Sequence, residues 1–154
     1  MWDLATGRAL ATLQGHAASV TGGVVTPDGQ RVVSASADDT LKVWDLATGR
    51  VLATLEGHTA SVTGCAVTPD GQRVVSVSFD HTLKVWDLAS RACLLTHRAN
   101  AVYTAVTATA TTIIAGDAVG AVWFLEWPSS HHRERSNPGS HNPAQVPSLL
   151  PRGR

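Results

Sequence analysis

The 154-residue sequence has few residues of the kinds that carry chemistry or cross membranes. It contains two cysteines, one tyrosine and two phenylalanines, and its charges cancel to a formal net charge of +0. Without a basic balance, neither nucleic acid nor an anionic membrane surface is indicated as a partner. No apolar run approaches the ~20 residues of a membrane-spanning helix, and the N-terminus lacks the build of a signal peptide. We therefore expect a cytoplasmic protein.

The sequence also lacks recognisable cofactor and metal sites. Cys65 and Cys93 form no C-x-x-C pair, so neither a disulfide framework nor a zinc site is indicated, and we expect both thiols to be buried and inert. His131, His132 and His141 lie among Pro and Ser with no thiol nearby, so metal binding there is expected to be adventitious. A glycine-rich phosphate loop and a G-x-S-x-G elbow are absent. No cofactor, no metal and no catalytic residue is predicted.

What the sequence does contain is a repeat. Residues 2–43 recur as residues 44–85 with 34 of the 42 residues unchanged, and a third copy opens at Trp86 with WDLAS and then decays. A fixed period in this range is typical of repeat architectures, in which one small unit cannot bury its apolar face alone and stacks on its neighbours.

Within the first repeat, short extended segments alternate with turn residues. The segments span 19–26, 31–36, 41–46 and 50–55, and Pro27-Asp28-Gly29 is the clearest turn, because Pro fixes φ and Gly accepts positive φ. Valine, alanine, leucine and threonine dominate the composition, and valine and threonine favour strands. Four short antiparallel strands in about 42 residues are typical of a propeller blade, so the predicted fold class is all-β.

The repeated motifs carry a resemblance to a known family. Gly15-His16, Pro27-Asp28-Gly29, Ser34, Asp38 and Trp44-Asp45 recur in register from Gly57-His58 to Trp86-Asp87, and this set is similar to that of the WD-repeat (WD-40) β-propeller family. The resemblance covers roughly residues 2–127. It implies three blades, at about 19–55, 61–96 and 101–126, in an open or partial ring, with residues 8–14 as an extra outer strand. Residues 128–154 turn to Pro, Ser, His and Arg and are expected to form a disordered tail.

Ser34, His16 and Asp38 have the residue types of a hydrolase triad. The same trio returns one period later, however, and an active site is normally a single constellation. The family resemblance instead implies two structural tetrads in which a Trp indole, a Ser hydroxyl, a His imidazole and an Asp carboxylate are hydrogen-bonded in sequence. The predicted tetrads are His16, Ser34, Asp38 and Trp44, and His58, Ser76, Asp80 and Trp86. In the third copy, Ala115, Val119 and Leu125 replace the Ser, Asp and Trp.

The resemblance also implies that partner proteins bind loop residues on the narrow face of the propeller. Carried over by position, the candidates are Ser19, Thr21, Ala37, Ser61, Thr63, Phe79 and Tyr103. Phe79 and Tyr103 are the strongest, because exposed aromatic residues are enriched at binding hot spots. The alternative is that these two aromatic rings pack against the neighbouring blade.

The expected function is therefore a non-catalytic protein-interaction scaffold or sensor. The segment 115–125 resembles the closing blade of propellers in bacterial multidomain signalling proteins, and we expect the chain to be a piece of a longer propeller. An alternative is a unit that completes a ring as a homo-oligomer, because propellers close with about 4–8 blades. An enzyme is the least favoured class.

Overall fold

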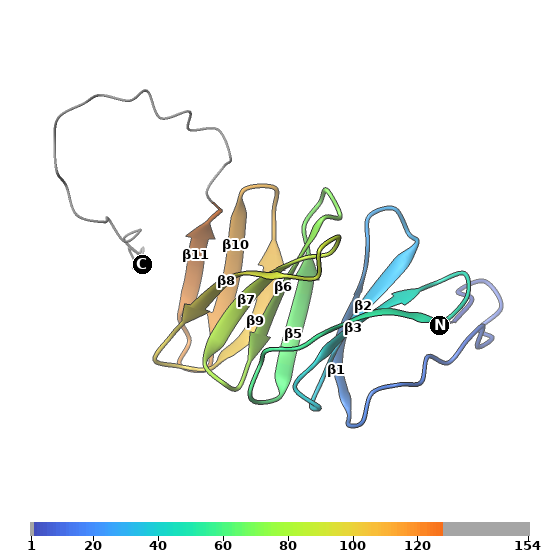
Figure 1. Ribbon diagram of the computed structural model, residues 1–154, viewed down its shortest axis with the longest axis horizontal. Helices are drawn as coiled ribbons and strands as arrows, with labels where there is room; N and C mark the ends of the chain where they lie inside the picture. Colours follow the sequence, from blue (N-terminus) through green and yellow to red (C-terminus); the bar gives the residue numbers. More distant parts are fainter. Residues whose placement is uncertain (1, 128–154) are drawn as a thin grey trace, which may run out of the picture.

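The computed structural model describes residues 2–127 and contains three antiparallel β-sheets that stack side by side (Figure 1). The predicted tail, 128–154, lies outside the described residues. We call the sheets blades 1, 2 and 3 in chain order. They do not close into a ring within residues 2–127, so the predicted fold class, all-β blades in an open arrangement, is confirmed.

Blades 1 and 2 each have four strands in sequential order, whereas blade 3 has three. Blade 1 consists of β1 (Val20–Val25), β2 (Arg31–Ser36), β3 (Leu41–Asp45) and β4 (Val51–Leu55). Blade 2 consists of β5 (Val62–Val67), β6 (Arg73–Ser78), β7 (Thr82–Asp87) and β8 (Cys93–Arg98), so its outer strand runs two residues past the predicted end at 96. Blade 3 consists of β9 (Tyr103–Ala108), β10 (Thr112–Asp117) and β11 (Val122–Glu126).

The first turn of each complete blade is closed by its own side chains. The Asp28 carboxylate accepts hydrogen bonds from the Thr26 hydroxyl and from the backbone N–H of Gln30, the latter at 2.9 Å. Gly29 adopts φ 70°, a left-handed conformation that costs glycine little. The same arrangement recurs around Asp70, so the repeated sequence sets the strand register twice in the same way.

The inner strand of each blade shows a register irregularity at one residue. The pairing of β1 with β2 jumps from Val20 to Gly22, and the pairings in the other two blades jump at the corresponding positions. The residues passed over are Thr21, Thr63 and Thr104. A β-bulge re-aims the side chain of the extra residue, and in blades 1 and 2 the threonine hydroxyl reaches the next blade.

The extra outer strand predicted over residues 8–14 is not formed. This segment makes one isolated bridge, between Trp2 and Ala9, and contains no strand. A strand requires a partner with a free edge. Among the described blades, blade 3 is the one that lacks a fourth, outer strand, and its β11 lies at the opposite end of the stack (Figure 1).

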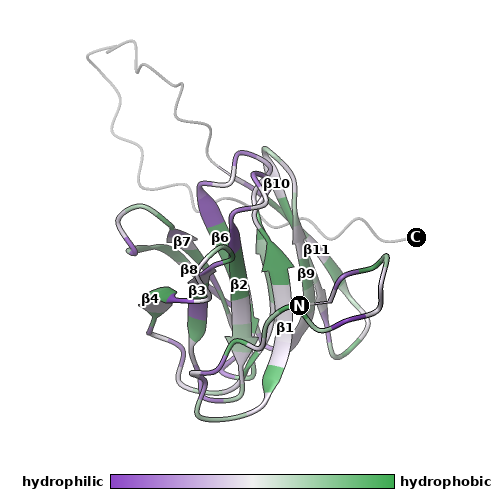
Figure 2. Cartoon of the chain, turned by 90° about the vertical axis from the view of Figure 1, so that its right-hand side faces the viewer, coloured by the Kyte–Doolittle hydropathy of each residue, from purple (hydrophilic) through white to green (hydrophobic). Residues whose placement is uncertain are grey.

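The hydrophobic core lies between the blades. One cluster joins blades 1 and 2, and a second joins blades 2 and 3. Blade 2 therefore buries both of its faces: Val74 and Trp86 belong to the first cluster, and Val75 and Leu83 belong to the second. Each end blade buries one face only. Figure 2 views the stack from the blade 1 end, where no further sheet covers β1 and β2.

Candidate protein-interaction surface

The loops named as partner-binding candidates come together at one edge of the blades. The segment that enters each blade is bonded to the turn between its second and third strands: the N–H of Ala37 donates to the carbonyl of Ser19 at 2.8 Å, and the N–H of Phe79 donates to that of Ser61 at 3.0 Å. Blade 3 repeats this bond between Ala118 and Val102. These backbone bonds hold two loops per blade in a fixed arrangement.

The predicted partner-binding residues differ in how far they are exposed to solvent. Ser19, Thr21, Ala37 and Phe79 are exposed, and the Phe79 side chain is 55% exposed at the tip of its turn. Ser61 and Thr63 are half-buried. Phe79 is thus the large apolar side chain that this surface presents in blade 2, where blade 1 has Ala37 at the same position.

Tyr103 does not lie on this surface, and its selection as a contact residue was wrong. It is fully buried, and its hydroxyl lies 3.0 Å from His97 Nδ1. Tyr103 is the first residue of β9, so its side chain lies in the interface with blade 2 and not in the preceding loop. The alternative stated from sequence, packing against the neighbouring blade, is the one that the structure shows for Tyr103.

Thr21 and Thr63 link neighbouring blades. The Thr21 hydroxyl donates to the carbonyl of Val62 in blade 2, and the Thr63 hydroxyl donates to the carbonyl of Tyr103 in blade 3 at 3.0 Å. Both are the bulged residues of their inner strands. Reading the sequence by position alone missed this role, although the in-register recurrence of Thr-Gly after a valine was a signal for it.

In blade 1 the four predicted tetrad residues form one chain of hydrogen bonds. The indole N–H of Trp44 donates to Ser34 Oγ at 2.8 Å, and Ser34 Oγ lies 2.7 Å from His16 Nε2. His16 Nδ1 lies 2.8 Å from Asp38 Oδ2. The same carboxylate oxygen accepts the backbone N–H of Ala17 at 3.0 Å, so the network fixes the loop that enters the blade.

Blade 2 repeats this chain of bonds with the same lengths. Trp86 Nε1 donates to Ser76 Oγ at 2.8 Å, Ser76 Oγ lies 2.7 Å from His58 Nε2, and His58 Nδ1 lies 2.8 Å from Asp80 Oδ2. A neutral imidazole with its proton on Nδ1 satisfies every member: it donates to Asp80 and accepts the Ser76 hydroxyl proton. The Asp80 carboxylate also accepts bonds from Thr82, so the tetrad anchors the turn that carries Phe79.

The electrostatics of blade 2 favour this neutral form. Burial lowers the pKa of His58 below its ordinary value, although Asp80 opposes the change. Burial acts against ionisation of Asp80, but hydrogen bonds from Thr82, His58 and the Thr59 N–H outweigh it and lower the Asp80 pKa to about 2. A neutral histidine therefore faces a firmly ionised aspartate.

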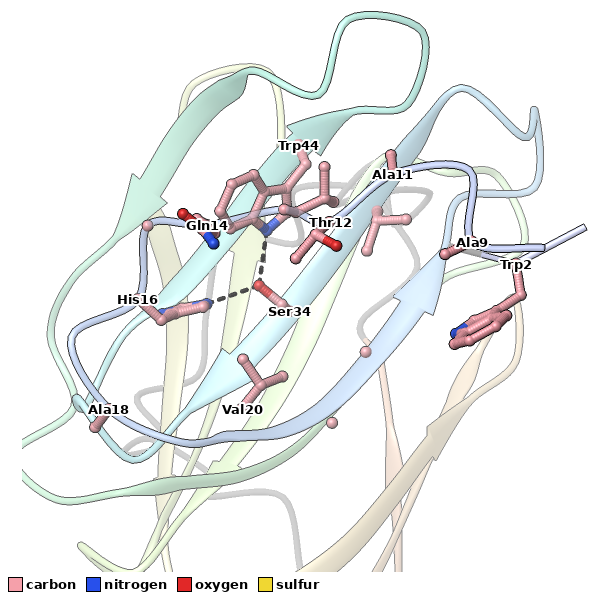
Figure 3. Close-up of a pocket in the computed structure, with 15 residues that line it drawn as sticks. Trp2, Ala9, Ala11, Thr12, Gln14, His16, Ala18, Val20, Ser34 and Trp44 are labelled. Atoms are coloured by element: carbon pink, nitrogen blue, oxygen red, sulfur yellow. Dashed lines mark hydrogen bonds between the residues drawn. The ribbon is translucent and has the colours of Figure 1, made fainter.

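A cavity of about 770 Å³ lies beside the blade 1 tetrad (Figure 3). Ser34, His16 and Trp44 line it, together with Trp2 and Val20. The arrangement resembles a triad next to a pocket, but the Ser34 oxygen already accepts the indole N–H. In blade 2 the same geometry is buried: Ser76 is 0% exposed and His58 is 7% exposed, so a substrate has no access there. Because the same network recurs where no substrate can reach it, we interpret both tetrads as structural.

In place of a tetrad, blade 3 has one polar pair of its own and a second pair that joins it to β8 of blade 2. Trp123 Nε1 donates to Asp117 Oδ2 at 2.8 Å, and Tyr103 bonds His97. The rings of His97, Tyr103 and Trp123 lie 6.3–6.5 Å apart between centroids. The sequence showed that the tetrad positions had changed, but it did not show this substitute, because its residues occupy other positions of the repeat.

The two cysteines differ from expectation in one respect. Cys65 is partly buried against blade 1, and burial raises its pKa to about 12, so its thiol is protonated at neutral pH. Cys93 is exposed at the start of β8 and was wrongly expected to be buried. Among residues 2–127, no three His, Cys, Asp or Glu side chains are grouped so as to hold a metal ion, and the three tail histidines lie outside that range. No helix in the same range is long and apolar enough to cross a membrane.

Comparison with known proteins identifies the family of the repeat. The family model described as "WD domain, G-beta repeat" matches residues 7–45 and again residues 49–87, together just over half of the chain. A comparison with curated proteins gave no match. The matched residues are those that form the two tetrads, the Pro-Asp-Gly turns and the blade 1–blade 2 interface. The chain belongs to the WD40 repeat family.

Proposed function

We propose that the chain is a non-catalytic protein-interaction module whose binding surface centres on Phe79. WD40 repeats are generally protein-interaction scaffolds. The observation that supports a specific site is the 55% exposure of the Phe79 ring on a turn fixed by the Phe79–Ser61 backbone bond and by the Asp80 carboxylate. A rigid, exposed aromatic residue loses little conformational entropy on binding and is typical of an interaction hot spot.

The neighbouring loops give this site its chemical character. Next to Phe79, blade 2 presents His81, whereas blade 1 presents Ala37 and Asp39. His81 and Asp39 both adopt a left-handed backbone conformation, with φ 66° and 68°. The surface that this chain offers to a partner is therefore an apolar ring flanked by polar groups. Such a surface suits a short peptide segment with a hydrophobic anchor residue.

The wider role is part of the same proposal. The resemblance of residues 115–125 to closing blades supports a scaffold or sensor role in a bacterial signalling protein, and the composition supports a cytoplasmic location.

The experiment is selection of random peptides displayed on phage against the immobilised full chain. We expect peptides that are enriched on the wild type to lose most of their binding to Phe79→Ala. Leu94→Ala is the matched control, because Leu94 is 47% exposed but lies on the outer strand β8. Peptides that bind both variants as well as the wild type would contradict the assignment of the site to Phe79.

A further inference from the structure

The blades of this chain pack through one type of interface, which is used twice. We call the face that a blade turns towards the following blade its forward face, and the opposite one its rear face. The forward face of blade 1 meets the rear face of blade 2, and the forward face of blade 2 meets the rear face of blade 3. One rear face, on blade 1, and one forward face, on blade 3, are left over.

Corresponding residues show how much apolar surface is left open. On the forward face, Leu83 and Val85 of blade 2 are 0% and 1% exposed, whereas Val122 and Phe124 at the same repeat positions of blade 3 are 58% and 59% exposed. On the rear face, Val62 is 0% exposed, whereas its blade 1 counterpart Val20 is 60% exposed. The two open faces are thus the two halves of an interface that the chain already makes twice.

The bulged threonines supply a hydrogen bond for a third such interface. Thr63 donates both to the Val77 carbonyl of its own sheet, at 3.2 Å, and to the next blade. Thr104, the equivalent residue of blade 3, makes the bond within its own sheet, to Gly116 at 3.4 Å. Across a third interface of the same type, its hydroxyl would meet the carbonyl of Val20, the counterpart of Val62.

The side-chain sizes of the open faces are complementary. At the blade 1–blade 2 interface, Cys65 of the rear face packs against Val33 of the forward face, with its Sγ 3.8 Å from the Val33 carbonyl. The corresponding pair on the open faces is Gly23 and Ile114, a smaller residue opposite a larger one. Gly23 lines the cavity of about 770 Å³ on blade 1, so the rear face is hollow where the forward face carries more volume. Side chains of residues 9–14 line the same cavity, and this segment would leave the rear face when it pairs with a second chain.

Residues 8–13 also match, in sequence, the outer strand that blade 3 lacks. Residues 8–13 read RALATL, and residues 50–55, which include β4, read RVLATL. The pairing of Leu41 with Leu55 and of Val43 with Ala53 in blade 1 corresponds to Val122 with Leu13 and Phe124 with Ala11. Residues 9–13 thus have the sequence and register to exchange their contacts within the single chain, among them the Trp2–Ala9 bridge, for pairing with the open edge of β11 of a second chain.

From these four matches we propose that two copies of this chain associate head to tail. The forward face of blade 3 in each copy covers the rear face of blade 1 in the other, and residues 9–13 of each copy pair with β11 of the other. Two chains then contribute six blades, within the range in which propellers close. Such a contact is heterologous, and closure after two copies gives a discrete dimer instead of a filament. This inference goes beyond the proposed function, since peptide binding at Phe79 does not require it.

The first test is the mass of the full chain in solution by light scattering coupled to size-exclusion chromatography. We expect twice the chain mass of 16.1 kDa at micromolar concentration. The variants Val20→Asp and Phe124→Asp should each reduce this to the single-chain mass, because a carboxylate in an apolar interface is strongly unfavourable. Both side chains are exposed in the single chain, so circular dichroism should show folded sheets in either variant.

The matched control is Val119→Asp, a change of the same type at a residue that is 78% exposed in the β10–β11 turn, outside the forward face. It should remain a dimer. A wild-type mass of 16.1 kDa at all concentrations, or a mass that grows without limit, would overturn the closed dimer.

A mixing experiment tests the head-to-tail direction. Val20→Asp chains have an unaltered forward face on blade 3, and Phe124→Asp chains have an unaltered rear face on blade 1. An equimolar mixture should therefore form a one-to-one complex through these two faces, which neither variant forms alone. If the mixture keeps the single-chain mass, the head-to-tail contact is wrong.

Discussion

Blades 1 and 2 share 34 of the 42 repeat residues, and the hydrogen bonds of their tetrads have the same lengths, yet their packing differs. Blade 2 has a sheet against each face, whereas blade 1 has a sheet against one. As a result Val62 is 0% exposed and its counterpart Val20 is 60% exposed. Local sequence determines the shape of a blade, and its neighbours determine which side chains contribute burial energy. Paired substitutions at equivalent positions can separate these two contributions.

The largest difference is expected for the tetrad tryptophans. Trp86→Ala should lower the free energy of unfolding by about 3–5 kcal/mol, because it removes a large side chain packed between two blades. Trp44→Ala should cost less, because Trp44 borders the open cavity and water can fill the space that it leaves. Urea denaturation measures both. The Phe124→Asp background should be used, since it keeps the rear face of blade 1 uncovered.

Equal losses for the two tryptophan variants would contradict this account. They would mean that the tetrad stabilises each blade on its own, independently of the blade packed beside it.

A smaller loss is expected for the tetrad histidines. His58→Ala removes the acceptor of the buried Ser76 hydroxyl and the ring nitrogen that bonds Asp80, which should cost about 1–3 kcal/mol. His16→Ala should cost less in the same background, because Ser34 and His16 line the cavity and water can replace the lost bonds. Thermal unfolding followed by circular dichroism measures both variants. A His58→Ala protein with unchanged stability would rule out the network as a source of stability.

The bulged threonines should give a still smaller difference. Thr63→Val removes the bond from blade 2 to the Tyr103 carbonyl and should cost about 0.5–1.5 kcal/mol. Thr104→Val in the Phe124→Asp background should have little effect, because Thr104 makes only its weak 3.4 Å bond within the sheet. In the wild-type dimer, the same Thr104→Val change should raise the dissociation constant. A Thr104→Val effect as large as that of Thr63→Val in the monomeric background would contradict the assignment of Thr63 as a link between blades.

The features that the sequence predicted correctly are those that depend on local, repeated chemistry. The Pro-Asp-Gly turns and the alternation of strand residues indicated four-stranded blades because a hairpin is determined by its own residues. The blade 3 substitute, in which Trp123 pairs with Asp117, has no counterpart in the first two copies, so the repeat gave no guide to it.

The features that the sequence predicted wrongly depend on what lies next to a segment. Residues 8–14 have almost the sequence of β4 and its flanking residues but form no strand, and the blade that lacks an outer strand lies at the other end of the stack. Tyr103 was aligned from sequence with loop residues, but its structural counterpart is Val62, the buried first residue of β5, and blade 2 covers it. The burial of a given repeat position thus depends on whether another blade packs beside it, and a single repeat does not contain that information.

The smallest effect is expected from pH, because lowering the pH leaves every side chain in place and changes only protonation. Burial lowers the pKa of His58 below 6.5, its ordinary value, and burial also lowers the pKa of His97. The unfolded chain therefore binds these protons more readily than the folded one. Stability should be fully present above about pH 6.5 and should fall as the pH drops below it. Asp80, with a pKa of about 2 against 3.8, adds a second loss of stability only below about pH 3.8.

The melting temperature at pH 7.5 and at pH 5.0 tests whether stability falls on acidification. We expect a lower value at pH 5.0 and a smaller difference in His58→Gln, whereas a melting temperature that rises on acidification would show that the tetrad prefers the imidazolium form.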